Sequence, residues 1–210
     1  MIDALELIRI HLELECKRID LDDFLYRIPC ANPDDMSRFY IAQYNEGVVR
    51  YFQYDLPASL CERLRMLSPE LAFQDIEGVK RILVDHAPCD DFHVGKSYIF
   101  PGNLTPDDYP DVARLEAAPG QLKYAIFADG QIISACESSR ENERAGEAWV
   151  YTEPAFRGKG YARKVTAAWA HHLQQQGKIP YYSHKLTNVA SQSLAHSLRL
   201  IHYMDDAAYV

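Results

Sequence analysis

Hydrophobic residues follow a helical period in the first part of the chain. Up to about residue 95, apolar positions recur every three or four residues, as on one face of an amphipathic helix; Leu5, Ile8 and Leu12 share such a face. Ser59 and Asp75 are candidate N-caps. The pattern predicts, in order, an opening helix, a helix over residues 33–44, a strand at 50–54, and helices over 56–67 and 75–86.

Beyond residue 95, short strand-like segments alternate with turn residues. The pattern predicts a strand over 91–100 that ends at Pro101-Gly102, followed by a loop with four prolines over 101–120. A hairpin of strands 123–127 and 131–138 around Asp129-Gly130, a polar loop over 139–147 and a strand over 148–152 come next. The last predicted elements are a helix over 160–176 ended by Gly177, a strand over 179–184, a helix over 188–200 capped by Asn188, and a strand over 201–210. The order after residue 120 is therefore β-β-β-α-β-α-β.

The change in pattern suggests two parts with a soft boundary near residue 95. Residues 1–95 form a mostly helical N-terminal segment, and residues 96–210 form a second, sheet-containing domain. A chain of 210 residues is long enough for one large domain or two small ones.

Composition narrows the class of protein. The net charge of −8 argues against general nucleic-acid binding, because proteins that bind phosphate backbones are usually basic. No apolar stretch is long enough to span a membrane, and the acidic, amphipathic start is unlike a secretion signal. Five scattered cysteines without a CxxC pair favour reduced thiols and a cytoplasmic protein over a disulfide framework or a zinc site. We expect no metal cofactor.

One basic segment stands out in this acidic chain. Arg157, Lys159, Arg163 and Lys164 surround two glycines between a predicted strand and a predicted helix. The first N–H groups of a helix have no internal partner and carry partial positive charge, and glycines allow the backbone to approach a ligand closely. The segment therefore predicts a local site for a phosphate or diphosphate group. Its spacing fits neither a Walker loop nor a dinucleotide GxGxxG motif.

The same segment resembles the acetyl-CoA signature of the GNAT superfamily of N-acetyltransferases, [Q/R]-x-x-G-x-[G/A]. The six residues Arg157-Gly158-Lys159-Gly160-Tyr161-Ala162 match it fully, and TEPAFR precedes it as a strand and a proline-aromatic step. The later strand, followed by Asn188 and Ser191 at a helix start, resembles the second conserved block. The resemblance covers residues 121–210. It implies an α/β (α+β) fold with a mixed, mainly antiparallel, twisted sheet flanked by helices.

The resemblance also implies a set of ligand-binding residues, with acetyl-CoA as co-substrate. These are the strand residues Val150, Tyr151 and Thr152, the loop and helix residues Arg157, Gly158, Lys159, Gly160, Tyr161 and Ala162, and the later Asn188 and Ser191. Three of these residues also have a purely structural interpretation: Tyr161 as a core residue, Asn188 as a helix cap, and Ser191 as an ordinary residue of the first helical turn.

The catalytic residues are less well defined by the sequence. Glu147 is the candidate general base, directly or through water, although it can also be interpreted as a surface carboxylate. Tyr203 is the candidate acid for the thiolate, with a serine on the last helix or solvent as alternatives. His184 ends a predicted strand near the expected site, and a solvated loop imidazole is its simpler interpretation. The chain departs from the family at Ala195, where many members have a tyrosine, and at Arg199, where a glycine is usual.

The function implied is transfer of an acetyl group from acetyl-CoA to an unidentified amine, on a small molecule or a protein, by direct attack. The N-terminal segment would cover the acceptor side or complete the sheet. We expect no nucleic-acid or membrane partner, and a homodimer stays open. Two alternatives remain: a non-catalytic acyl-CoA-binding regulatory module, and a nucleotide-binding protein that uses the same anion site.

Overall fold

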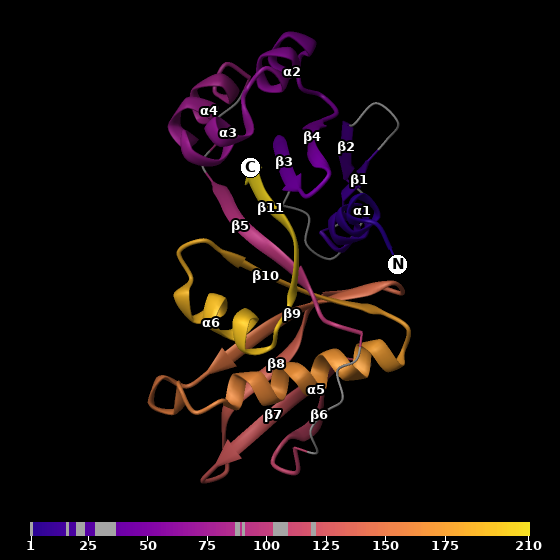
Figure 1. The fold of residues 1–210 in the computed structure, drawn as a ribbon, viewed down its shortest axis with the longest axis vertical. Helices are drawn as coiled ribbons and strands as arrows, with labels where there is room; N and C mark the ends of the chain where they lie inside the picture. Colours follow the sequence, from indigo (N-terminus) through magenta and orange to yellow (C-terminus); the bar gives the residue numbers. More distant parts are fainter. Residues whose placement is uncertain are drawn as a thin grey trace. The chain divides into compact units, whose positions relative to one another are not determined.

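The computed structural model describes residues 2–15, 17–19, 24–27, 37–86, 89, 91–102, 109–118 and 121–210 (Figure 1). The chain divides into two compact units. The first comprises residues 1–97 and 203–210, and the second comprises residues 98–202. The chain therefore enters the second unit within one strand, β5, and returns to the first within another, β11.

The first unit combines helices with a sheet. Its elements are α1 (Ala4–Leu14), β1 (Lys17–Ile19), β2 (Phe24–Arg27), β3 (Phe39–Tyr44), β4 (Gly47–Gln53), α2 (Ala58–Arg65), α3 (Pro69–Gln74), α4 (Ile76–Leu83), most of β5 (Phe92–Ile99) and most of β11 (Ile201–Tyr209). The strand order is β1-β2-β4-β3-β11-β5. The helices expected at the start of the chain and over 56–67 and 75–86 are confirmed, as is the strand at 50–54.

Aromatic stacking explains the main difference from the sequence prediction in this unit. Residues 39–44, expected in a helix, form β3; residues 33–36 of that prediction lie outside the described residues. Phe39 stacks on Phe52 of β4 and on Tyr209 of β11, with ring centroids 5.6 and 6.0 Å apart. β3 pairs antiparallel with both strands. Pairing with the next strand, β4, and with the distant strand β11 thus overrides a weak helical pattern.

Of the two helix N-caps predicted in this unit, one is confirmed and one is wrong. The carboxylate of Asp75 accepts a hydrogen bond from the Gly78 N–H at 3.0 Å, which confirms Asp75 as the cap of α4. Ser59 lies inside α2, which begins after Pro57 without a side-chain cap, so the prediction of a Ser59 cap is wrong. Helix α3, capped by Ser68, was not predicted.

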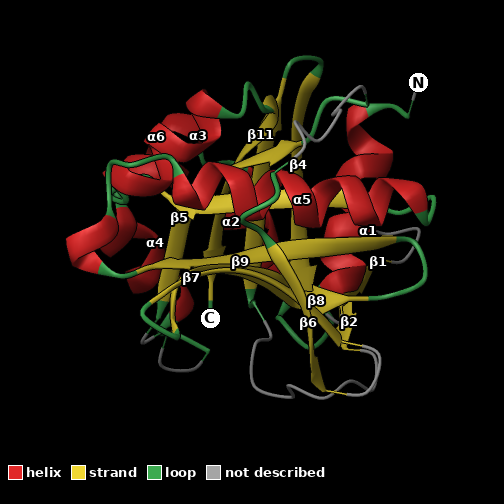
Figure 2. Cartoon of the chain, turned by 90° about the horizontal axis from the view of Figure 1, so that it is seen from below, coloured by secondary structure: helices red, strands yellow, loops and turns green. Residues whose placement is uncertain are grey.

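The second unit is a mainly antiparallel sheet flanked by helices, which confirms the predicted fold class (Figure 2). Its elements are β6 (Ala113–Ala118), β7 (Gln121–Ala128), β8 (Gln131–Glu141), β9 (Ala145–Thr152), η1 (Pro154–Phe156), α5 (Tyr161–Gln175), β10 (Ile179–Lys185) and α6 (Val189–Ser197). The strand order is β10-β9-β8-β7-β6, and β9 and β10 form a parallel pair.

Local turn chemistry in this unit follows the sequence closely. Asp129 and Gly130 connect β7 and β8 with φ values of 50° and 75°, as a two-residue hairpin turn requires. The polar loop expected over 139–147 is shorter, because β8 extends to Glu141 and β9 begins at Ala145. The side chain of Asn142 closes this turn by accepting hydrogen bonds from the backbone N–H groups of Arg144 and Ala145. The loop expected over 101–120 contains β6, and residues 103–108 and 119–120 lie outside the described residues.

Helix α5 supplies the core of the second unit. Its apolar face, with Val165, Trp169 and Leu173, packs on Ile126, Ile133 and Cys136 of the sheet. The Trp169 indole N–H donates to Ser138 Oγ at 3.0 Å, which fixes the helix on β8. In the part of the chain that the structure describes, no helix is long and apolar enough to cross a membrane.

Gly146 allows α5 to approach β9 closely. A Cβ atom at this position would stand 2.7 Å from Leu173 Cδ1 and 3.3 Å from Ser138 Oγ. We therefore expect Gly146→Ala to lower the free energy of unfolding of this unit by about 1–3 kcal/mol, through overpacking. Urea unfolding followed by tryptophan fluorescence measures it, since both tryptophans, Trp149 and Trp169, lie in this unit. Gly102→Ala is the control, because its Cβ would meet nothing within 4 Å; equal midpoints for the two variants would contradict the prediction.

Arg199 occupies a position that favours glycine. It follows α6 with a φ of 53°, and the N–H groups of Arg199 and Leu200 donate to the carbonyls of His196 and Ala195. This is the hydrogen-bond pattern of a Schellman motif, whose left-handed residue is usually glycine. Arg199→Gly should therefore stabilise the second unit by about 0.5–1 kcal/mol. The same urea experiment tests it, with Arg199→Ala as the control that keeps the Cβ atom; a lower midpoint for the glycine variant would be the contrary result.

Candidate functional site

The parallel strands β9 and β10 pair along only part of their length. Ile179 lies opposite Ala145, Pro180 opposite Gly146 and Tyr181 opposite Glu147. Both strands continue beyond the last pair, β9 to Thr152 and β10 to Lys185. We call residues 148–152 and 182–185 the β9/β10 branch. Two strand segments that leave each other in this way expose backbone hydrogen-bonding groups on their facing edges.

The register with β8 tells which amides of β9 face the branch. The Glu153 N–H donates to the Ile133 carbonyl at 2.9 Å, and Thr152 lies opposite Ser134. Because hydrogen-bonded and non-hydrogen-bonded pairs alternate along an antiparallel ladder, the amide of Tyr151 faces β8, whereas those of Val150 and Thr152 point away from it. Of the three predicted strand residues, two thus direct an N–H toward the β9/β10 branch.

The glycine loop that follows β9 leaves the start of α5 open. Gly158 and Gly160 have φ values of 74° and 82°, and a Cβ at either would meet nothing within 4 Å. The backbone conformation, rather than lack of space, therefore favours glycine here. Gly160 is the N-cap of α5 and makes no side-chain capping hydrogen bond. The N–H groups of the first turn, from Tyr161 onward, are thus not occupied by a side-chain cap.

The basic residues around this loop divide into two kinds. Arg157, Lys159 and Arg163 are exposed; the Arg157 Nε donates to the Thr152 carbonyl at 3.1 Å, and the Lys159 ammonium lies 5.0 Å from the centroid of the Phe156 ring. Lys164 instead pairs with Asp111 at 2.8 Å. Three of the four cations therefore remain as the exposed charges of the loop.

Two predicted ligand residues at the start of α5 also have structural contacts. Tyr161 is half-buried and packs against the core of the unit, with its ring 6.4 Å from that of Phe156. Ala162 is half-buried beside it. The core interpretation of Tyr161 is confirmed for its ring, and its backbone N–H belongs to the open first turn.

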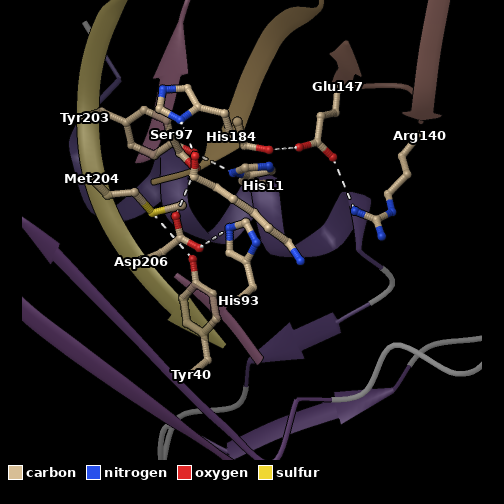
Figure 3. A network of polar contacts seen from close by, with 12 residues as sticks. His11, Tyr40, His93, Ser97, Arg140, Glu147, His184, Tyr203, Met204 and Asp206 are labelled. Carbon is tan, nitrogen blue, oxygen red and sulfur yellow. Dashed lines mark hydrogen bonds and ion pairs between the residues drawn. The ribbon is translucent and has the colours of Figure 1, made fainter. Parts of the chain in front are cut away.

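Glu147 lies at the last pair before the β9/β10 branch and is 6% exposed. One carboxylate oxygen accepts a hydrogen bond from the Ser183 hydroxyl of β10, and the other lies 3.3 Å from Arg140 Nη1 of β8 (Figure 3). The interpretation of Glu147 as a surface carboxylate is therefore wrong. Sequence reasoning missed Arg140 and Ser183, because only the pairing of three strands brings them together.

The aromatic residues beyond Glu147 on the same face of β9 form an exposed pair. The rings of Trp149 and Tyr151 stack with centroids 6.2 Å apart, and Trp149 is 48% exposed. A hydrogen bond to Glu153 raises the pKa of Tyr151 above its ordinary value.

Asn188 and Ser191 both have partners within the fold. The Asn188 side chain accepts a hydrogen bond from the Ser191 N–H at 3.1 Å, which confirms it as the cap of α6. Burial raises the pKa of Tyr182, and a hydrogen bond with the Ser191 side chain opposes this rise. Ala195, where the family often has a tyrosine, is buried in the core.

Tyr203 belongs to the first unit, whereas the residues above belong to the second. Its hydroxyl lies 2.6 Å from His11 Nδ1 (Figure 3). Nearby on the same strand, Asp206 accepts a hydrogen bond from Ser97 at 3.2 Å and lies 3.6 Å from His93. Burial raises the pKa of Asp206, while the charges of His93 and His11 oppose the rise. The predicted role of Tyr203 as a thiolate acid stays a prediction.

His184 differs most from its sequence interpretation. It was expected as a solvated loop imidazole, but it is 4% exposed, so this interpretation is wrong. Its ring stacks on Tyr98, with centroids 5.4 Å apart. Among the described residues, no cluster of three or more His, Cys, Asp or Glu side chains is placed to hold a metal ion.

Comparison with known proteins identifies this architecture. Residues 120–205 match the family model described as GNAT acetyltransferase. A GNAT-family acetyltransferase structure from Novosphingobium aromaticivorans aligns with a TM-score of 0.50 and 17% identity over 58% of this chain and 65% of that one. A GNAT-family acetyltransferase from Colwellia psychrerythraea aligns with a TM-score of 0.50 and 12% identity over 92% of this chain and 79% of that one.

The two structures share less than 25% sequence identity with this chain, so they support the fold alone. This chain spans just under two thirds of the length of the first structure. No curated protein matches the sequence. The family model, the signature residues and the fold agree on residues 120–205, so this part of the chain is similar to GNAT acetyltransferases.

Proposed function

We propose that the second unit binds acetyl-CoA and that the protein transfers its acetyl group to an amine. The observation that carries the proposal is the β9/β10 branch together with the open, glycine-initiated start of α5, the helix that connects β9 to β10. This combination offers two sets of backbone N–H donors close together in the chain. The N–H groups at the start of α5 suit a diphosphate. The N–H groups of β9 that face the branch suit an extended, amide-containing arm that ends in a thioester.

The diphosphate of the proposed substrate would lie against the N–H groups of residues 158–162. Helix N-termini bind anions through these groups and through the helix dipole. Arg157, Lys159 and Arg163 are exposed there and add charge. The acidic net charge of the chain does not oppose this, because screening confines the effect of distant surface charges to about 10 Å.

The pantetheine arm would follow β9, with the amides of Val150 and Thr152 as donors. Negative charge develops on the thioester oxygen as the amine attacks, and an N–H donor facing that oxygen stabilises it. Binding both reactants in one geometry supplies a further part of the rate. The acceptor is an amine of a small molecule or a protein. It must be neutral to attack, and Glu147, the predicted base, borders the branch.

A second function has one observation in its favour. Ala195 is buried where family members often have a catalytic tyrosine, so a non-catalytic acyl-CoA-binding module would need no replacement for it. Binding of acetyl-CoA is common to both functions, and turnover separates them.

Replacing Gly160 tests the proposed diphosphate site. We expect Gly160→Asp combined with Arg157→Ala to weaken acetyl-CoA binding by about 100-fold or more, since it places a carboxylate where the diphosphate would lie and removes a cation. Isothermal titration calorimetry measures the dissociation constant. Gly160→Asn has a similar shape without the charge, and Gly130→Asp introduces an aspartate at the same kind of positive φ in a distant turn of the unit. Both controls should bind more tightly than the double variant.

Unchanged affinity in the double variant would remove this loop from the proposed site. Thermal shifts with acetyl-CoA and with ATP address the nucleotide alternative, and stabilisation by ATP alone would contradict the proposal. A panel of amines with detection of released thiol then separates enzyme from module. Binding of acetyl-CoA without turnover of any acceptor would favour the module.

A further inference from the structure

The imidazole of His184 carries a buried polar atom without a partner. The side chain is 4% exposed, and within the part of the chain that the structure describes its Nε2 atom makes no hydrogen bond. Buried polar atoms are nearly always paired, because leaving one unpaired costs free energy. An unpaired atom in a candidate active site therefore points to a ligand or a reacting group that pairs with it.

The contacts of the ring define which form of the imidazole is present. His184 Nδ1 lies 3.1 Å from the backbone carbonyl oxygen of Lys185. A carbonyl only accepts, so Nδ1 carries the hydrogen, and in the neutral ring Nε2 then carries the lone pair. The rings of Tyr98 and Tyr182 contact the imidazole at centroid distances of 5.4 and 6.4 Å. The ring is thus held in one orientation with a free lone pair.

His184 lies in the β9/β10 branch. Continuing the observed register, with Tyr181 opposite Glu147, places His184 level with Val150, whose amide is directed toward the branch. His184 shares a face of β10 with Tyr182, which packs in the core with Val165 of α5. Ser183, on the other face, contacts Glu147, and Figure 3 shows the His184 ring directed away from Glu147.

Glu147 has a structural role at the start of the branch. One of its oxygens accepts a hydrogen bond from Ser183 and the other contacts Arg140, so the side chain connects three strands. The lone pair of His184 Nε2, in contrast, has no partner among the described residues. We propose that His184 Nε2, rather than Glu147, accepts the proton from the attacking amine, and that Glu147 is a positioning residue that holds the start of the branch. This inference rests on the proposed acetyl transfer.

The proposed step balances as follows. The neutral amine nitrogen forms a bond to the thioester carbon, and the carbon–sulfur bond breaks with its electron pair passing to sulfur. His184 Nε2 takes one proton from the attacking nitrogen and returns it to the coenzyme A thiolate. The products are the amide and the free thiol, and His184 is again neutral.

The test replaces His184 with a residue that cannot carry the proton. Thiol release is measured with the amine that gives the highest rate, or with water as acceptor. We expect His184→Gln to lower kcat by about 100-fold or more while the acetyl-CoA dissociation constant stays within about twofold. His196→Gln, an exposed histidine on α6, is the control and should leave both unchanged.

A pH profile separates proton transfer from ring packing. The wild-type kcat/KM should fall toward low pH as the imidazole becomes protonated, and His184→Gln should lack this acidic limb. Among the described residues, the rings of Tyr98 and Tyr182 contact the imidazole, and His202 contacts Tyr98. His202→Gln therefore serves as a further control that should retain the limb. Glu147→Gln should lower kcat, by loosening the contacts to Arg140 and Ser183, yet keep the limb.

The possible failures are distinguishable. Wild-type protein that does not bind acetyl-CoA would overturn the proposed function itself. Wild-type protein that binds acetyl-CoA but turns over no acceptor would overturn both catalytic proposals. An active His184→Gln variant with an intact acidic limb, or a Glu147→Gln variant that loses that limb, would overturn the role of His184 alone.

Discussion

The candidate site depends on one constraint, the early end of the pairing between β9 and β10. β9 is paired with β8 up to Thr152, but with β10 only up to Glu147. The outward amides of Val150 and Thr152 are therefore left for a ligand. Glu147 stands at the point of separation and contacts β10 through Ser183 and β8 through Arg140. One carboxylate thus ties together the three strands whose arrangement defines the branch.

The position of α5 complements this constraint. The helix is fixed to the sheet by Trp169 and by the close approach of Leu173 to Gly146, one residue before Glu147. These contacts hold the second half of the helix on the sheet. The exposed cations near the start of α5 can vary in conformation, whereas the backbone donors cannot. Affinity for an anion and precision in placing it therefore come from different groups.

The sequence predicted those features that depend on neighbouring residues. The Asp129-Gly130 hairpin, the Asn188 cap and the start of α5 each follow from a few consecutive residues, and so does the signature loop. β3 was mistaken for a helix because its stability comes from stacking with other strands, through Phe52 of the neighbouring β4 and through Tyr209 of β11, which is far away in sequence. The partners of Glu147 and the burial of His184 could not be predicted either, because they depend on the pairing of strands that are distant in sequence.

The pairing state of buried polar groups gives a physical way to separate supporting residues from reactive ones in this unit. Glu147 has both oxygens in contact with partners within the fold, one with Ser183 and the other with Arg140. His184 is as deeply buried as Glu147, but within the described residues its Nε2 atom has no hydrogen-bond partner, and Thr166 Oγ1 is the other such atom of this unit. Folding alone gains nothing from such an atom, and an apolar ring would pack there at lower cost. An unpaired imidazole nitrogen on the strand segment that leaves β9 is what the proposed proton transfer requires.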